Sequence, residues 1–312
     1  MPGSSLITGA TGFAGGHLLD LLIARGERVH AWGHTTAGPG SDTHSPVTWR
    51  SVDLLDRAAV REGLNAARPS VIYHCAGFAH LQDAWRQPAR ALRVNVLGTH
   101  VLFEAARDLD LACRIFVTGS AQVYRPSATA ITEDDPVGPD NPYGISKLAQ
   151  EMMTAASPIP AWLTRPFNHA GPRQSPAYAT SAFAQQIADI EAGRRDAVLH
   201  VGNLDAQRDI TDVRDTVRAY HAIVSSGQTR RPYNVCSGRT YTMRRLLDML
   251  RSLARVRVRV EIDPARLRPS DNPVILGSHA RLTADTGWTP VIPIEQTLAD
   301  LLEHWRRTTT AA

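Results

Sequence analysis

Lysine is almost absent from this chain. Of its 34 basic side chains, only Lys147 is a lysine, and every other one is an arginine. A lysine ammonium is a compact point charge on a thin stem, whereas the guanidinium of arginine is a broad planar fork. We therefore expect Lys147, in the stretch NPYGISK over 141–147, to occupy a position where an ammonium is required.

Tyr143 stands four residues before this lysine. On a helix that spacing places both side chains on one face, and a nearby cation lowers the pKa of a tyrosine, which suits an acid/base catalyst. A chance meeting of the two side chains on an exposed helix is the alternative, and the spacing alone leaves it open. The other motifs of the chain have to decide between the two.

Cysteines and long apolar runs are scarce as well. The three cysteines, Cys75, Cys113 and Cys236, lie in or beside apolar strand-like segments, as buried free thiols in a reducing compartment do. No apolar stretch is long enough to span a bilayer, and the opening MPGSSLITGATG leads into a strand without a secretory signal. We expect a cytoplasmic protein with no membrane partner.

Motifs for metals, hydrolysis and nucleic acids are missing. His30 and His34 have the spacing of helical metal ligands but straddle the end of a predicted strand, and the chain has no HExxH or CxxC pair, so we expect no metal site. A GxSxG nucleophile elbow is also absent. The net charge of +4 is mild, and the basic run RVRVRVEI from Arg255 alternates as a half-buried strand does, so we expect no nucleic-acid partner.

The first 33 residues contain a strand, a glycine-rich turn, a helix and a second strand. LIT leads into Gly9, Gly12 and Gly15, an apolar helical stripe follows, and ERVHAW forms the next strand. Between a strand and a helix, such glycines provide a tight turn and room for a pyrophosphate at the helix N-terminus. The segment predicts a dinucleotide-binding loop.

Strands and helices continue to alternate as far as about residue 165. VIYHCAG, CRIFVTGS and the helix around Tyr143 belong to this series, and such alternation is typical of a doubly wound parallel sheet. We predict an α/β protein with a Rossmann-type domain over 1–165, to which segments at about 205–240 return. A smaller mixed α/β substrate domain, mainly 166–312, includes a terminal helix that follows Pro293.

Ligands of such sheets bind at the C-terminal ends of the strands. CAG at 75–77 and TGS at 118–120 are small residues at two of these ends, and Asp53 ends another strand, where it either hydrogen-bonds an adenine or caps the next helix. The second strand ends in Ala31, Trp32, Gly33 and His34, without the carboxylate that binds the ribose hydroxyls of NAD and without an arginine. This favours NADP(H) and leaves NAD(H) open.

The glycine loop, the CAG turn, Ser120 and the YxxxK pair occur in an order that resembles the extended short-chain dehydrogenase/reductase family, over nearly the whole chain. The resemblance implies that Tyr143 is the catalytic acid/base, that Lys147 holds the nicotinamide ribose and lowers the tyrosine pKa, and that Ser120 hydrogen-bonds the reacting oxygen. It implies cofactor contacts at Gly9, Thr11, Gly12, Phe13, Ala14, Gly15, His34, Asp53, Leu54, Cys75, Ala76, Gly77, Asn95, Tyr143 and Lys147. The chemistry agrees independently, because a phenol and a hydroxyl stabilise the charge that hydride transfer develops on a ketone oxygen.

Segments of the second half, among them RPFNHAGPRQS and VGNLDAQRDITDVRD, are similar to the GDP-mannose branch of this family, and most similar to GDP-4-keto-6-deoxy-D-mannose reductases. The similarity implies an NAD(P)H-dependent 4-ketoreductase that acts on a GDP-linked 4-keto-6-deoxy sugar and forms GDP-D-rhamnose; the C4 epimer of the product stays open. It also implies a homodimer through helices near Ala91 and Tyr143. The implied substrate contacts are Ser120, Ala121, Tyr143, Asn168, Val201, Arg208, Arg268 and Asp271.

Dehydration of nucleotide sugars and their epimerisation at C3 and C5, which members of this family catalyse, require catalytic side chains in addition to the serine, tyrosine and lysine. Dehydratases of the family place a carboxylate two residues after the serine, where this chain has Gln122, and an amide cannot exchange a proton near neutral pH. Reductases that also epimerise C3 and C5 look as though they need a cysteine and a histidine, which Cys113 and His169 do not match. A nucleotide-sugar 4-epimerase with bound NAD stays the main alternative. A non-catalytic dinucleotide sensor is a lesser one, because the retention of Lys147 argues against it.

Overall fold

The computed structural model describes residues 4–34, 46–267 and 272–311. Arg268 and Asp271, two of the residues predicted to bind substrate, lie outside these ranges. Among the described helices, none is long and apolar enough to cross a membrane.

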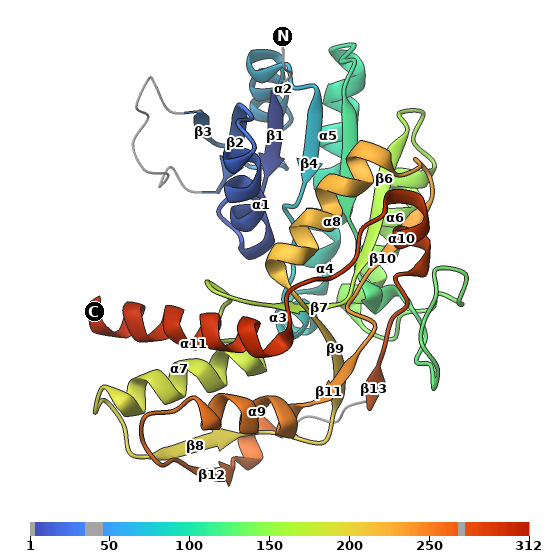
Figure 1. Ribbon diagram of the computed structural model, residues 1–312. Helices are drawn as coiled ribbons and strands as arrows, with labels where there is room; N and C mark the ends of the chain where they lie inside the picture. Colours follow the sequence, from blue (N-terminus) through green and yellow to red (C-terminus); the bar gives the residue numbers. More distant parts are fainter. Residues whose placement is uncertain (1–3, 35–45, 268–271, 312) are drawn as a thin grey trace.

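A large parallel sheet organises the molecule (Figure 1). Within the described residues it has seven strands in the order β10-β6-β5-β4-β1-β2-β3, and every neighbouring pair is parallel. The chain leaves β1 in one direction for β2 and later returns on its other side as β4, which is the switch point where doubly wound sheets bind ligands. The strands are β1 (Ser5–Thr8), β2 (Val29–Gly33), β3 (Val47–Ser51), β4 (Val71–His74), β5 (Arg114–Thr118), β6 (Ala161–Pro166) and β10 (Pro232–Val235). The predicted Rossmann-type α/β fold is confirmed.

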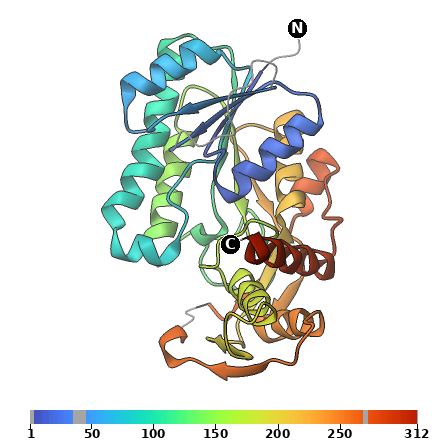
Figure 2. The same cartoon turned by 90° about the vertical axis from the view of Figure 1, so that its left-hand side faces the viewer.

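Helices cover both faces of this sheet (Figure 2). One face carries α1 (Phe13–Ala24), α8 (Val213–Ser226) and α10 (Ala280–Thr286), and the other carries α2 (Arg57–Ala67), α5 (Gly98–Asp108) and α6 (Pro142–Ala155). Between β4 and α5 the chain forms α3 (Leu81–Arg86), α4 (Pro88–Leu92) and a π-helical turn (Arg93–Leu97). Because both faces are covered, β1 (SLIT) is buried at every position, and its two central residues, Leu6 and Ile7, are apolar.

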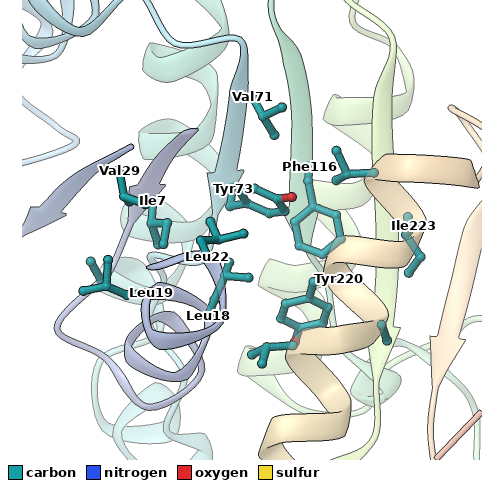
Figure 3. Packing of buried hydrophobic residues seen from close by; sticks show 14 of the residues in the cluster. Ile7, Leu18, Leu19, Leu22, Val29, Val71, Tyr73, Phe116, Tyr220 and Ile223 are labelled. Atoms are coloured by element: carbon teal, nitrogen blue, oxygen red, sulfur yellow. The ribbon is translucent and has the colours of Figure 1, made fainter. Parts of the chain in front are cut away.

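Aromatic side chains fill the core between the sheet and α8. Figure 3 shows Tyr73 and Phe116 from neighbouring strands, with Tyr220 of α8 packed against Phe116 at a ring separation of 4.8 Å. Leu18 and Leu22 of α1 extend the same cluster. This packing holds α1 and α8 against the sheet. Because the glycine turn leads directly into α1, the packing also positions that turn.

A second group of elements packs around its own apolar core. It contains α7 (Ala179–Glu191), α9 (Met243–Ser252), α11 (Ile294–Ala311) and the parallel pair β8 (Val198–Val201) and β12 (Arg259–Ile262). Leu199, Leu246 and Leu298 are fully buried there. The strand predicted from RVRVRVEI is shorter than expected, because only its second half pairs with β8.

A small sheet lies between the two groups (Figure 1). In it β9 (Gln207–Asp212) pairs with β7 (Asn168–Ala170), β11 (Thr240–Thr242) and β13 (Val274–Ile275). The chain then rejoins the large sheet through α8 and β10. The division at about residue 165, with a return at about 205–240, stays a prediction.

The glycine turn depends on backbone contacts that tolerate no side chain. A Cβ on Gly15 would lie 2.1 Å from the carbonyl oxygen of Gly9, and Gly9 itself has a φ of +72°. A Cβ on Gly16, the next residue of α1, would meet its nearest atom, the carbonyl oxygen of Ala10, at an ordinary 3.5 Å. The two adjacent glycines therefore differ in the space available for a Cβ atom, and Gly16 can serve as the control for Gly15.

We expect Gly15→Ala to lower the free energy of unfolding by about 1–3 kcal/mol, because overpacking against backbone cannot be relieved by a side-chain movement. Gly16→Ala should leave it unchanged or raise it by about 1 kcal/mol, since alanine favours a helix interior. Urea unfolding followed by tryptophan fluorescence measures both. Equal stabilities of the two variants would contradict the close approach at Gly15.

Candidate active site

A cleft of about 1770 Å³ lies at the C-terminal ends of the large sheet's strands, between the two groups of elements. This exceeds the volume that one drug-sized ligand needs, so the cleft has room for a larger ligand or for more than one. All described residues that were predicted to bind cofactor or substrate line it, with the exception of Asn95. The fold therefore brings the predicted side chains together from both groups.

The N-terminus of α1 is open toward this cleft. Its N-cap residue is Gly12, no side chain caps its first turn, and that turn contains no acidic residue. A Cβ on Gly9 would lie 2.7 Å from the backbone nitrogen of Ala76, so the glycine turn and the end of β4 meet backbone to backbone. Uncapped N–H groups beside a bare backbone suit a pyrophosphate. The residues present fit a dinucleotide cofactor.

Asp53 and His34 line the cleft at the ends of β3 and β2. The Asp53 carboxylate accepts a hydrogen bond from the backbone nitrogen of Leu55 at 2.9 Å, and the residue is exposed. Asp56, and not Asp53, caps α2, because it accepts from the backbone nitrogens of Ala58 and Ala59. The alternative role of Asp53 as the helix cap is therefore wrong, and adenine binding stays a prediction.

Asn141 and Pro142 start the helix that carries the tyrosine. The Asn141 side chain accepts a hydrogen bond from the backbone nitrogen of Gly144 at 2.8 Å, and Pro142 occupies the first turn. A Cβ on Gly144 would lie 2.3 Å from the carbonyl oxygen of Gln122, so α6 touches the segment after β5 directly. This contact places Tyr143 within hydrogen-bonding range of Ser120.

Burial raises the pKa of Tyr143 to about 12, although a hydrogen bond with Ser120 opposes the shift. The prediction that the adjacent lysine would lower this pKa is therefore wrong. The reason is that burial disfavours the charged phenolate. The Lys147 ammonium donates to the carbonyl oxygen of Thr118 at 2.7 Å and to Oε1 of Gln150 at 2.8 Å.

The position of Lys147 explains why arginine did not replace it. The side chain is buried, and a Cβ on Gly77 would lie 3.6 Å from its Nζ atom. A planar guanidinium with five donors would need more space and more acceptors than this site offers. Burial also lowers the pKa of Lys147 to about 8, while the nearby Cys75 thiol acts in the opposite direction.

Asn95 does not line the cleft, contrary to its predicted cofactor contact. It is fully buried in the π-helical turn, where its Oδ1 accepts from the backbone nitrogen of Phe78 at 2.7 Å. Its Nδ2 donates to the carbonyl oxygen of Phe78 at 3.2 Å and to Oγ of Ser146 at 2.8 Å. The amide therefore acts indirectly, by tying the loop after β4 to α6.

The predicted substrate residues come from both groups of elements. Asn168 on β7 is exposed to the cleft, and Val201 lines it from the end of β8. Arg208 on β9 is half-buried, and its guanidinium donates to the carbonyl oxygens of Gln207 at 2.7 Å and Pro273 at 3.3 Å. Ala121 lies beside Ser120, whose Oγ accepts from the backbone nitrogen of Gln122 at 3.1 Å.

Sequence reasoning missed several residues that line the cleft. Tyr178, just before α7, packs edge-on against His80 with ring centroids 5.8 Å apart, and its phenol contributes to the raised pKa of Tyr143. Arg90 lies over the ring of Phe78 at 5.9 Å. The place of His80, six residues after the end of β4, could have indicated it, whereas Tyr178 belongs to no motif.

Among the described residues, no group of three or more histidine, cysteine or acidic side chains could hold a metal ion. The three cysteines are free. Burial raises the pKa of the Cys75 thiol, which lines the cleft, to about 12.

Comparisons with known proteins agree with this geometry. The sequence pattern of the family described as GDP-mannose 4,6 dehydratase matches residues 6–301. GDP-6-deoxy-D-mannose reductase from Pseudomonas aeruginosa is 36% identical over 310 residues, which cover 96% of each chain.

Two solved structures show the same fold. RMD from Pseudomonas aeruginosa, complexed with NADPH, has a TM-score of 0.85 and 32% identity, and the match covers 98% of this chain and 99% of that one. UDP-glucose 4-epimerase from Thermus thermophilus, in complex with NAD, has a TM-score of 0.84 and 26% identity, with 97% and 99% covered.

Replacing Asn95 with leucine should unfold the loop that it anchors. We expect Asn95→Leu to lower the free energy of unfolding by about 2–4 kcal/mol, because the N–H and C=O of Phe78 lose their buried partner. NADPH affinity, measured by quenching of protein fluorescence, should fall as well. Asn65→Leu on the exposed face of α2 is the control and should change stability by less than about 0.5 kcal/mol. If Asn95→Leu is destabilised but binds NADPH with unaltered affinity, the loop after β4 does not contribute to cofactor binding.

Proposed function

The chain belongs to the GDP-mannose 4,6-dehydratase family of extended short-chain dehydrogenases/reductases, and we propose that it reduces the C4 ketone of GDP-4-keto-6-deoxy-D-mannose with NADPH to form GDP-D-rhamnose. The observation that carries this proposal is that the hydroxyls of Ser120 and Tyr143 lie close enough to interact, in a cleft of about 1770 Å³. The similarity to GDP-6-deoxy-D-mannose reductase supports the choice of sugar.

The two hydroxyls suit a ketone reduction. A bound reduced nicotinamide would supply the hydride, and negative charge then develops on the C4 oxygen. Ser120 donates a hydrogen bond to that oxygen, and Tyr143 donates a hydrogen bond and then its proton. A phenol with a pKa of about 12 is protonated throughout the neutral range, so Tyr143 is in its proton-donating form before reaction.

We assign Lys147 to cofactor binding. An ammonium has three N–H donors, and two of them serve Thr118 and Gln150. We assign the third to a hydroxyl of the nicotinamide ribose. The residues of the glycine turn would hold the pyrophosphate at the N-terminus of α1, and His34 at the end of β2 leaves the adenosine ribose without a repelling carboxylate from that strand, which favours NADPH over NADH.

Gln122, two residues after Ser120, argues against dehydration as the reaction of this site. Elimination across C5 and C6 requires an additional acid and base at the sugar. Gln122 lines the cleft at the position where a dehydratase has its carboxylate, and its Oε1 accepts a hydrogen bond from Nδ2 of Asn141 at 3.3 Å. An amide has no proton to exchange near neutral pH.

The deciding experiment mixes purified protein with GDP-4-keto-6-deoxy-D-mannose and either NADPH or NADH, and it follows the absorbance of the reduced nicotinamide. We expect oxidation of NADPH in preference to NADH, and no oxidation with the UDP- and dTDP-linked keto sugars. NMR of the product establishes the configuration at C4. Activity confined to the equilibration of C4 epimers with tightly bound NAD would instead identify a 4-epimerase.

Two variants serve as controls for this assay. Tyr143→Phe removes the proton donor and should lower kcat by at least about 100-fold. Lys147→Arg should remain folded, by circular dichroism, and lose most of its turnover, because the guanidinium cannot occupy the narrow site of the ammonium. Full activity of Lys147→Arg would contradict the role assigned to the lysine.

We also infer that two copies of the chain pair through α3, α4 and α6. These helices contact one another, and they expose large apolar side chains: Trp85 is 60% exposed, Ile145 48% and Met152 64%. Ala91 and Tyr143, the residues named from sequence, are themselves buried or half-buried, so they would support the interface from beneath. Large exposed apolar side chains on helices that contact one another favour a protein interface.

Met152→Glu should weaken this dimer, because it places a charge in an apolar interface. We expect the variant to elute as a monomer in size-exclusion chromatography with light scattering, whereas the unmodified protein elutes as a dimer. Ile262→Glu on β12, which is 60% exposed, is the matched control and should leave the mass unchanged. A wild-type protein that is monomeric at micromolar concentration would refute the interface.

The three free thiols support a cytoplasmic location, where such groups stay reduced.

A further inference from the structure

The Lys147 ammonium begins a buried chain of hydrogen bonds that crosses the domain. Gln150 accepts from the ammonium through Oε1 at 2.8 Å and donates from Nε2 to Oγ1 of Thr99 at 2.7 Å. Thr99 Oγ1 lies 2.9 Å from Nε2 of His74, and His74 Nδ1 lies 2.8 Å from Oγ1 of Thr8. All five side chains are buried, and they come from α6, α5, β4 and β1.

The direction of each hydrogen bond in this chain follows from the donors available. The single hydroxyl proton of Thr99 goes to the carbonyl oxygen of Asn95 at 2.6 Å, so Thr99 can only accept from Gln150 and from His74. His74 therefore carries its proton on Nε2, and its Nδ1 accepts from Thr8. Burial, together with the charge of Lys147, lowers the pKa of His74 to about 3, so this ring is neutral at any working pH.

This arrangement also determines how the Gln150 amide is turned. Its NH₂ group faces the one hydroxyl that can only accept, and its oxygen faces the ammonium. A flipped amide would place two donors against Lys147 and leave Thr99 without its donor. Thr99, whose proton goes to the Asn95 carbonyl, thus directs the glutamine, and the neutral His74 donates to the same threonine oxygen.

We propose that Gln150, oriented by Thr99 and His74, is a positioning residue that holds the Lys147 ammonium at the end of β5 and keeps it protonated. This deepens the proposed function, because a charged Lys147 is what the cofactor ribose would meet. Gln150 does not line the cleft, so it acts through the lysine and touches neither cofactor nor substrate.

Neutral oxygen atoms hold the Lys147 ammonium in place and stabilise its charge. Within the described residues, its protein acceptors are a backbone carbonyl and the Gln150 amide, and no carboxylate pairs with it. The ionisable groups that interact with its charge are His74, which is neutral, and Cys75, whose thiol is kept protonated by burial. Tyr143, one turn earlier on α6, is also in its neutral form. Removing one of two acceptors should therefore make protonation of Lys147 distinctly less favourable.

The scarcity of lysine provides a direct test that needs no substrate. Protein grown with lysine labelled by ¹³C at Cε and ¹⁵N at Nζ has one labelled side chain, and its titration can be followed by NMR between pH 6 and 11. Gln150→Met keeps the length and removes the acceptor, and its midpoint should fall by about one pH unit. Gln150→Glu keeps the shape and adds a negative charge, and its midpoint should rise.

Thr154→Val is the matched control. Thr154 is buried on the same helix and donates to the backbone carbonyl of Gln150 at 2.8 Å, without touching the lysine. Its titration should superimpose on that of the unmodified protein. Opposite shifts in the two Gln150 variants support the proposal, and unchanged midpoints in both would overturn it. If Gln150→Met fails to fold, Gln150→Glu decides the question. A raised Lys147 midpoint in that variant supports the proposal, and an unchanged midpoint overturns it.

The kinetic consequence separates this proposal from the proposed function. The alkaline limb of kcat/KM for ketone reduction should move in the same direction as the NMR midpoint in each variant. Shifted NMR midpoints in a protein that reduces no keto sugar would support the positioning role and refute the reductase. Shifted kinetics with unchanged midpoints would overturn the positioning role, because a structural defect would then explain the loss.

Discussion

The active site depends on one buried positive charge that, among the described residues, has only uncharged partners. Lys147 donates to a backbone carbonyl at the end of β5 and to an amide of α6. Burial of a charge is costly unless hydrogen bonds compensate for it, and here they come from groups that must themselves be held in place. The chain through Gln150, Thr99 and His74 supplies that support, and it ties α6 and α5 to β4 and β1.

The parallel sheet makes such a chain feasible. Parallel strands end at the same edge, so residues that are far apart in sequence, such as Thr8, His74 and Thr118, become neighbours. At this edge Gly9 meets Ala76 backbone to backbone, and Gly144 meets Gln122 in the same way. These close approaches bring Ser120 to Tyr143 and open the N-terminus of α1 toward the cleft. The smaller group of elements then closes the cleft with Val201 and Arg208.

Tyr143 illustrates how the packing changes the chemistry. A lysine four residues later predicts a lowered pKa, but burial disfavours the charged phenolate and raises the pKa of Tyr143. A raised pKa suits a residue whose first task is to donate a proton.

The sequence by itself determined those features whose physical cause is local. The glycine turn, the alternation of strands and helices and the spacing of Tyr143 from Lys147 follow from short-range sterics and periodicity, so they predicted the fold, the cofactor loop and the pair proposed for catalysis. Only the tertiary structure decided the partners of Asn95, Lys147 and His74, and it brought Tyr178 beside His80. Those contacts join residues that are distant in the chain, and no local pattern records which buried donor will meet which acceptor.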